Sequence, residues 1–358
     1  MGREESVNYG ALWTWARFNP RRTALLLRIS WRHWHAICRH RRKQRRIEGS
    51  IPSVLAISPT MRCNYNCKGC YSRGRPTDNE LSTRELDALF SEAEELGVHS
   101  IVLTGGEPFL RGDALHLVAR HRRLLFFIIT NGSLITPDIA HRIARSGNAI
   151  PLVSIEGFPT DTDDRRQSGA HETALRAFDQ LRKAKALFGF VATNTATNSA
   201  QLATEAFIDQ MVAIGCAVGF FTEYVPCGPN PNPDWVLDDV TRASFRKCIL
   251  EFRRSKPIVL SQFPDDEYGK ENRCTGAGRV SFHINSQGDV EPCPFVPIAR
   301  ENIRHGGLIA ACRSPFLCAI REQPKLLQRQ HYACSLFEHG TELDGLAQQF
   351  GRRDAKNP

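Results

Sequence analysis

The chain has 358 residues, of which 41% are apolar and 24% are charged, an ordinary composition for a globular protein. It has no apolar run of about 18 residues and no cleavable signal peptide, so we expect neither a membrane span nor secretion. Most of its 12 cysteines cluster near metal-binding spacings, in a chain too long for a small disulfide scaffold. This cysteine usage favours a reducing, cytoplasmic location.

The formal net charge of +9 comes from the first 50 residues. Residues 1–50 hold 12 Lys and Arg against 3 Asp and Glu, which leaves 35 of each kind for the remainder. Four of the 5 tryptophans also lie there: Trp13, Trp15, Trp31 and Trp34. Leu27, Trp31, Trp34 and Cys38 recur at helical spacing, which predicts a basic helix with an aromatic stripe. That stripe suits packing on the following domain or peripheral contact with an anionic membrane, and a nucleic-acid-binding arm is the least favoured interpretation.

Strand and helix patterns alternate from residue 54 to residue 225. Apolar runs at 54–57, 100–104, 124–129, 151–156, 189–196 and 217–225 predict strands of a parallel sheet covered by helices. Ser82 and Glu85 have the spacing of a capping box, which predicts that a helix begins there and runs to about Leu96. This alternation indicates an open or closed α/β barrel, in which functional loops follow the carboxyl ends of the strands.

The first of these loops holds Cys63, Cys67 and Cys70 in a C-x3-C-x2-C spacing. Three thiolates so close together can bind three irons of a cubane and leave the fourth iron free, whereas Fe–S clusters normally take four cysteines. The alternatives are a zinc knuckle, which usually needs four ligands, and a disulfide with a spare thiol. The spacing resembles the signature of the radical SAM superfamily, whose open iron binds S-adenosylmethionine (SAM).

The loop after the second strand is Gly105-Gly106-Glu107-Pro108. Its glycines permit close backbone approach, and its carbonyl and carboxylate oxygens can accept from an ammonium group. A tight strand-to-helix turn is the alternative. The loop resembles the superfamily's GGEP motif, which contacts the SAM amino group.

The later strand ends carry polar residues at positions similar to SAM contacts in the superfamily. For these residues, strand caps and turns are the alternative interpretation. The resemblance implies contacts to the SAM ribose and carboxylate from Thr130, Asn131, Ser154, Glu156 and Arg165, and contacts to SAM or substrate from Asn194 and Tyr224. The superfamily often has an aromatic residue before its last cluster cysteine, where this chain has Gly69, and we expect Tyr71 to supply that packing.

The C-terminal part returns to cysteines. Cys274, Gly288 and Cys293 match the C-x9–15-G-x4-C opening of SPASM and Twitch extensions, which are the auxiliary-cluster domains of radical SAM enzymes. The intervening residues predict a β-hairpin that brings two thiolates together. The resemblance implies one auxiliary 4Fe–4S cluster on Cys274, Cys293, Cys334 and either Cys312 or Cys318, with zinc as the rival occupant and core packing as the alternative for Cys318. Cys38, Cys216, Cys227 and Cys248 are expected to be small buried residues.

The resemblance implies a partial (β/α)6 TIM-like barrel. We expect a basic segment at 1–50, the core at 51–235, a SPASM/Twitch-like domain at 236–340 and a tail at 341–358. The resemblance also implies an enzyme that cleaves SAM reductively to a 5′-deoxyadenosyl radical. This radical would functionalise a C–H bond of a ribosomally made peptide or protein, and flavodoxin or ferredoxin would be the electron donor.

Two alternatives stay open. The first is a membrane-associated radical SAM enzyme that acts on a lipid, an isoprenoid or another small molecule. The second is a non-catalytic Fe–S or zinc protein with a nucleic-acid-binding arm.

Overall fold

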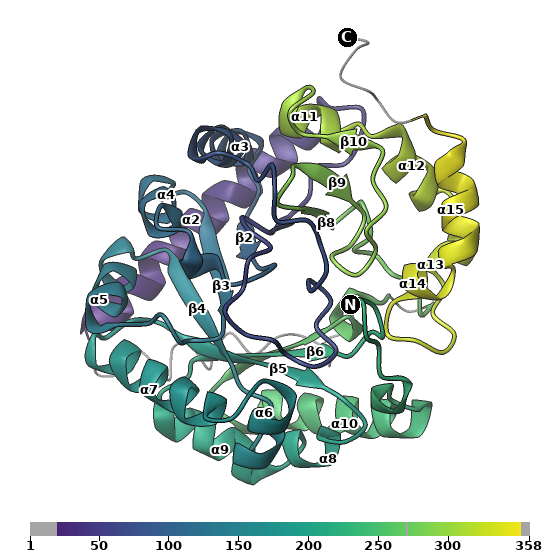
Figure 1. Cartoon of the computed structure of the whole chain (residues 1–358). Coiled ribbons are helices and arrows are strands. Elements are labelled where there is room, and N and C mark those ends of the chain that lie inside the picture. The colour runs from purple at the N-terminus through teal and green to yellow at the C-terminus, as the bar shows by residue number, and fades with distance from the viewer. Residues whose placement is uncertain (1–19, 270, 352–358) are drawn as a thin grey trace.

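Figure 1 shows the computed structural model, which describes residues 20–269 and 271–351. One 10-stranded sheet organises it, in the order β10-β9-β8-β1-β2-β3-β4-β5-β6-β7. The strands from β8 through β1 to β7 are parallel neighbours, and β9 and β10 extend the β8 edge as antiparallel strands. The sheet curls into a barrel that stays open, because no ladder joins β7 to β8 in the described part of the chain.

The six predicted strands between residues 54 and 225 are confirmed, and so is their parallel arrangement. The strands are β1 (Val54–Ile57), β2 (Ser100–Leu103), β3 (Leu125–Thr130), β4 (Ala149–Ser154), β5 (Gly189–Asn194), β6 (Val218–Glu223), β7 (Val259–Phe263), β8 (Ser281–Ile284), β9 (Asp289–Glu291) and β10 (Glu301–Asn302).

Two further parallel strands extend the predicted set. β7 lies beside β6, and β8 lies beside β1, with Ser281 opposite Val54. The predicted hairpin around Gly288 is confirmed as β8 and β9. Its incorporation into the barrel sheet was not foreseen, because a pairing between such distant segments leaves no local signal in the sequence.

The expected boundary near residue 235 does not separate two cores. Leu55 and Ile101 belong to the same buried apolar cluster as Phe282, Phe316 and Leu343. The C-terminal segment therefore packs against the barrel as part of one hydrophobic core.

Helices cover the outside of the sheet. Those of the barrel are α3 (Thr83–Leu96), α4 (Ala114–Arg120), α5 (Pro137–Ser146), α6 (Pro159–Arg165), α7 (Ala170–Lys183), α8 (Ser199–Leu202), α9 (Glu205–Ile214) and α10 (Asp239–Ser255). Ser82 and Glu85 form the predicted capping box at the start of α3. The C-terminal helices lie on the side of the β8–β10 edge (Figure 1) and are α11 (Gly307–Cys312), α12 (Pro315–Arg321), α13 (Pro324–Leu327), α14 (Ser335–Glu338) and α15 (Gly340–Gln348).

The basic N-terminal segment forms α2 (Pro20–Gln44), while Trp13 and Trp15 lie outside the described residues. Leu25 and Ile29 of α2 pack on an apolar cluster that contains Ile150 and Leu152 of β4. Arg32 donates to the carbonyl of Gly147, just before β4 begins, at 3.2 Å. The helix therefore packs across the amino-terminal ends of the strands. The expected packing of the aromatic stripe on the barrel is wrong, because Leu25 and Ile29 make that contact and the stripe is exposed.

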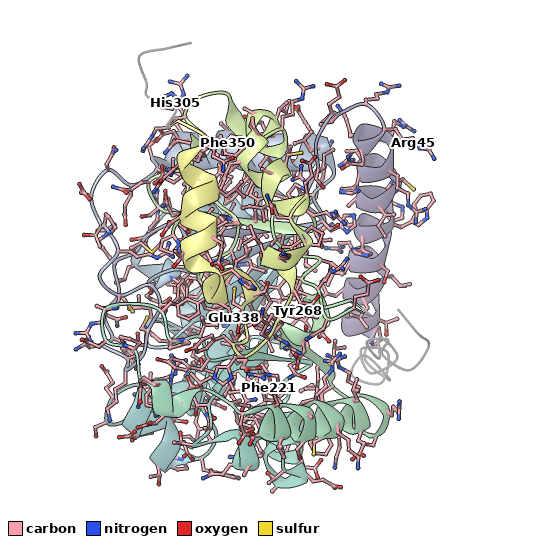
Figure 2. The ribbon with its side chains drawn as sticks, turned by 90° about the vertical axis from the view of Figure 1, so that its right-hand side faces the viewer. Arg45, Phe221, Tyr268, His305, Glu338 and Phe350 are labelled. Carbon is pink, nitrogen blue, oxygen red and sulfur yellow. The ribbon has the colours of Figure 1, made fainter. Side chains whose placement is uncertain are left out.

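The outer face of α2 carries the aromatic stripe. Leu27, Trp31 and Trp34 are 55%, 62% and 59% exposed. In the side view of Figure 2, side chains of α2 project away from the barrel, and Arg45 lies just beyond the end of the helix. None of the helices formed by the described residues is long and apolar enough to cross a bilayer.

The contact between α2 and the barrel depends on Gly97, which has a φ of +80°. A Cβ at Gly97 would lie 2.4 Å from the amide nitrogen of His40. We expect Gly97→Ala to lower the free energy of unfolding by about 1–3 kcal/mol, measured by urea denaturation. Gly112→Ala is the control, because a Cβ there meets no atom within 4 Å. Equal stability of the two variants would contradict this account of the contact.

Candidate functional site

The carboxyl ends of the parallel strands bring the predicted site loops to one edge of the sheet. The three-cysteine loop follows β1, the Gly105–Pro108 loop follows β2, and Asn131 follows β3. Ser154, Asn194 and Glu223 are the last residues of β4, β5 and β6. The predicted grouping of these loops is therefore present in the fold.

The three-cysteine loop is anchored at both of its sides. The amide of Lys68 donates to the carbonyl of Arg165 at 2.8 Å, and its ammonium pairs with Asp164 at 2.6 Å. At the other side, the Asn131 side chain donates to Asn64 at 2.9 Å. These bonds tie the loop to α6 and to the end of β3.

The thiols of Cys63, Cys67 and Cys70 are free, and each is at least partly accessible. In the described ranges, no three His, Cys, Asp or Glu side chains converge tightly enough to hold one metal ion. A cubane does not need that convergence, because each thiolate binds a different iron.

The glycines of the second loop allow two chain segments to touch. A Cβ at Gly106 would lie 2.0 Å from the carbonyl oxygen of Arg62, the residue before the first cysteine of the loop. The amides of Gly106 and Glu107 donate to the carbonyls of Thr60 and Arg62, each at 2.9 Å. The glycine pair therefore lets the loop after β2 hold the start of the cysteine loop.

Glu107 is 1% exposed and links the ends of β2 and β3. Its carboxylate accepts from the Thr130 hydroxyl at 2.9 Å and from the amides of Asn131 and Phe109 at 2.8 and 3.1 Å. Burial raises the pKa of Glu107, and these hydrogen bonds oppose the rise. Pro108 is buried and begins a short 3-10 turn over Pro108–Leu110.

A buried cluster of charge lies beside the cysteines. Glu156 is fully buried, and its Oε1 meets the guanidinium groups of Arg165 and Arg166, each at 2.6 Å. Its Oε2 accepts from the Thr193 amide at 2.7 Å. Burial raises the pKa of the Cys67 thiol, and the charges of Arg166 and Arg165 oppose that rise. The positive charge of this cluster therefore offsets part of the rise in the pKa of Cys67.

Two polar groups near this edge lack hydrogen-bond partners. Asn194 is 1% exposed, and neither its amide nitrogen nor its amide oxygen has a partner in the structure. The Nε of Arg165 is also buried without a partner. Since buried polar groups are nearly always paired, these atoms indicate positions prepared for a ligand.

The aromatic packing at Gly69 comes from the other side of the barrel. Gly69 has a φ of +61°, and a Cβ there would lie 2.9 Å from the Tyr224 ring and 3.0 Å from the Trp235 ring. These two rings pack edge to face with centroids 5.5 Å apart. Tyr71, for which we expected this role, directs its hydroxyl to Thr104 at 2.8 Å and to the Gly105 amide at 3.1 Å.

A cavity of about 210 Å³ lies between the cysteine loop and the segment after β6. The two sides supply its lining: Cys67, Lys68, Gly69, Cys70, Arg73, Pro229, Asn230, Asn232 and Trp235. Sequence reasoning missed Trp235 and Arg166. The available signals were that Trp235 is the one tryptophan beyond residue 50 and that Arg166 adjoins Arg165.

Three C-terminal cysteines form a second group. Tyr268 pairs as a β-bridge with Cys274, and its hydroxyl donates to the Ala333 carbonyl and accepts from the Ser335 amide, both at 3.0 Å. This arrangement places Cys334 beside Cys274. The Cys293 thiol donates to Cys334, which raises the pKa of Cys293 and lowers that of Cys334. Tyr268 marks this region in Figure 2.

The other two predicted ligands lie elsewhere. Cys312 is buried at the end of α11, and its carbonyl accepts from the Ser50 amide at 2.9 Å. The Cys318 thiol contacts Glu322 at 3.5 Å and lines a separate cavity of about 680 Å³ with Arg46 and Arg321. Neither contact joins these thiols to the group of Cys274, Cys293 and Cys334.

Comparisons with known proteins agree with this geometry. Residues 57–193 match the family model of the radical SAM superfamily. The chain is 33% identical over 290 residues to the AdoMet-dependent heme synthase of Oleidesulfovibrio alaskensis, covering 73% of this chain and 74% of that one. It is 34% identical over 266 residues to the mycofactocin maturase MftC of Mycobacterium ulcerans, covering 68% of this chain and 69% of that one.

Two solved structures share the fold. SuiB of Streptococcus suis bound to S-adenosylmethionine superposes with a TM-score of 0.65 at 18% identity, over 79% of this chain and 71% of that one. The enzyme anSMEcpe with bound AdoMet superposes with a TM-score of 0.60 at 16% identity, over 83% of this chain and 99% of that one.

The buried charge cluster makes a stability prediction. Glu156→Gln leaves two buried guanidinium groups without their carboxylate, so we expect the free energy of unfolding to fall by about 3–5 kcal/mol in urea denaturation. The exposed pair of Glu172 and Arg176 on α7 provides the control, since Glu172→Gln should cost less than about 0.5 kcal/mol. A Glu156→Gln variant as stable as this control would contradict the proposed balance of charge.

Proposed function

Because this chain belongs to the radical SAM superfamily, we propose that it is an enzyme that functionalises a C–H bond of a ribosomally made peptide or protein. Its cofactors are a 4Fe–4S cluster and SAM, as in the rest of the superfamily. The observation that carries the proposal is the anchored loop of Cys63, Cys67 and Cys70 at the carboxyl edge of the sheet.

The residues at this edge fit the two cofactors. Cys63, Cys67 and Cys70 would hold the cluster, and the charges of Arg166 and Arg165 oppose the rise that burial causes in the pKa of Cys67. The unpaired amide of Asn194 and the unpaired Nε of Arg165 offer hydrogen bonds to a polar ligand. The chemistry supplied by SAM on a reduced cluster is its cleavage to methionine and a 5′-deoxyadenosyl radical, which abstracts hydrogen from a C–H bond.

The protein groups then have positioning roles. Glu107 fixes the ends of β2 and β3, and Glu156 fixes Arg165 and Arg166, so both carboxylates act through their neighbours. Ser154 is 4% exposed at the end of β4, where it remains a candidate SAM contact. Tyr224 and Trp235 pack against Gly69, and Trp235 also lines the adjoining cavity. Preorganised polar groups in a closed site are what such a cofactor needs from its protein.

The proteins similar to this chain fall into two groups by the substrates that their names indicate. Some are named heme synthases and others mycofactocin maturases, and SuiB has been solved with its precursor peptide SuiA. We favour a peptide over a lipid because the aromatic stripe of α2 lies at the end of the barrel opposite the cysteine loop. A membrane bound there would not deliver its lipids to the site. A mass change in a precursor peptide encoded beside the gene, after incubation with SAM and reductant, tests this assignment.

The assay of the radical mechanism compares two variants under anaerobic conditions with dithionite. We expect the Cys63/Cys67/Cys70→Ala variant to lose about four irons per chain and to form no 5′-deoxyadenosine, because the SAM-binding cluster is absent. Cys248→Ala, which removes a thiol of α10, should keep both the iron and the product. If the triple variant still formed 5′-deoxyadenosine, the cysteine loop would not be the site of SAM cleavage.

We also propose that α2 makes peripheral contact with an anionic membrane. Leu27, Trp31 and Trp34 are exposed on one stripe, and exposed Arg28, Arg41 and Arg42 accompany them. Exposed tryptophans flanked by arginines are typical of helices that lie in the interface of a negatively charged bilayer.

Sedimentation with phosphatidylglycerol-containing vesicles tests this membrane contact. We expect Trp31→Ala/Trp34→Ala to weaken vesicle binding at least about tenfold, because two large apolar side chains no longer enter the interface. Val240→Ala removes an apolar side chain that is 80% exposed on α10, and this control should bind like the unmodified protein. Undiminished binding by the double variant would contradict a membrane-binding role of the stripe.

A further inference from the structure

The group of Cys274, Cys293 and Cys334 has one thiolate fewer than a fully ligated 4Fe–4S cluster, which takes four. Cys312 lies buried at the end of α11, where its carbonyl accepts from the Ser50 amide at 2.9 Å. On α12, Leu317 and not Cys318 faces the Cys274 loop, because a Cβ at Gly278 would lie 3.2 Å from Leu317. Both sequence-predicted candidates for the fourth position are therefore directed elsewhere.

A different cysteine lies between the two thiol groups. Cys227 follows the end of β6, and the next residue, Gly228, abuts the cysteine loop, where a Cβ would lie 2.7 Å from the Cys70 carbonyl oxygen. The Cys227 thiol is half-buried. Its chain segment is thus fixed against the last cysteine of the SAM-cluster loop.

The end of β6 is also tied to the segment that carries Cys334. Arg242 donates to Glu223, the last residue of β6, at 2.8 Å. The same guanidinium donates to the carbonyl of His331 at 2.9 Å. One buried ion pair therefore holds the segment before Cys227 and the segment before Cys334 together. Burial raises the pKa of the Cys227 thiol, and the nearby thiols of Cys334 and Cys70 add to that rise.

An arginine whose side chain is 11% exposed completes this environment. Arg75 pairs with Glu291 at 2.9 Å and donates to the carbonyl of Pro294, the residue after Cys293, at 2.6 Å. Its positive charge opposes the rise in the pKa of Cys227. The Tyr71 ring, which adjoins Cys70, packs on Phe295 with centroids 5.3 Å apart. The Cys293 turn therefore lies against the same region of the cysteine loop that Gly228 contacts.

From this convergence we infer that Cys227 is the fourth ligand of the auxiliary cluster, together with Cys274, Cys293 and Cys334. The inference rests on the proposed radical SAM function and replaces Cys312 and Cys318 as candidates. On binding, the Cys227 thiol releases its proton to solvent and forms an S–Fe bond without any change in oxidation state. The auxiliary cluster would then adjoin the SAM-cluster loop through the Cys227–Gly228 segment.

The test uses full-length protein in which Cys63, Cys67 and Cys70 are replaced by alanine, so that only an auxiliary cluster contributes iron. This background protein should hold about four irons per chain and give a 4Fe–4S EPR signal on reduction. Adding Cys227→Ala or Cys227→Ser should reduce the iron content to about three or fewer, or change the g values of that signal. Adding Cys312→Ser or Cys318→Ser should change neither, and these variants are the matched controls.

Three outcomes overturn the inference or its premise. Full iron and an unchanged EPR signal in both Cys227 variants would remove Cys227 from the ligand set. Loss of iron with Cys318→Ser or Cys312→Ser alone would assign the fourth position to that cysteine. Absence of iron from the background protein, while the unmodified chain still cleaves SAM, would overturn the auxiliary cluster and leave the SAM-dependent activity in place.

Discussion

The contact on which the site depends is the approach of the Gly105–Gly106 backbone to the chain just after β1. Two amide-to-carbonyl bonds join these segments where a Cβ at Gly106 would lie 2.0 Å from the Arg62 oxygen. Because Arg62 immediately precedes Cys63, the sheet transmits its rigidity directly to the first cluster ligand. Glu107 extends the same attachment to β3 through three hydrogen bonds. The Gly105–Pro108 motif, which is usually considered for its ligand contacts, therefore also anchors the cysteine loop to the sheet.

The charged side chains around the site are held in ion pairs rather than exposed to solvent. Glu156 with its two arginines, Glu223 with Arg242, and Glu291 with Arg75 are all buried pairs near the strand ends. Replacing one member of such a pair is costly because the other charge stays buried. In the cases of Arg242 and Arg75, the arginine reaches beyond its carboxylate to a backbone carbonyl of the C-terminal segment. These pairs orient the second thiol group with respect to the first.

Structural features that depend on residues close together in the sequence are predicted well. Sequence patterns located the six strands from β1 to β6, the capping box of Ser82 and the hairpin at Gly288. The sequence could not predict contacts between distant segments that no local pattern encodes. Such long-range contacts include the packing of Trp235 on Gly69, the pairing of β8 with β1, and the approach of the Cys227 segment to the Cys334 segment. The surroundings of Tyr71 and of the C-terminal cysteines are likewise set by contacts across the barrel, about which spacing along the chain says little.

The pairing of β8 with β1 also affects how the protein is made. Until residue 284 has left the ribosome, one edge of β1 in the growing sheet has no partner, and unpaired strand edges promote association between chains. At about 5–20 residues per second, roughly 10 to 40 s pass between synthesis of β2 and synthesis of β8. During that interval β1 can pair with β2 and the three-cysteine loop is already present, whereas Cys293 and Cys334 are not. The order of synthesis therefore places the three-cysteine loop on the growing sheet before the group of Cys274, Cys293 and Cys334 is complete.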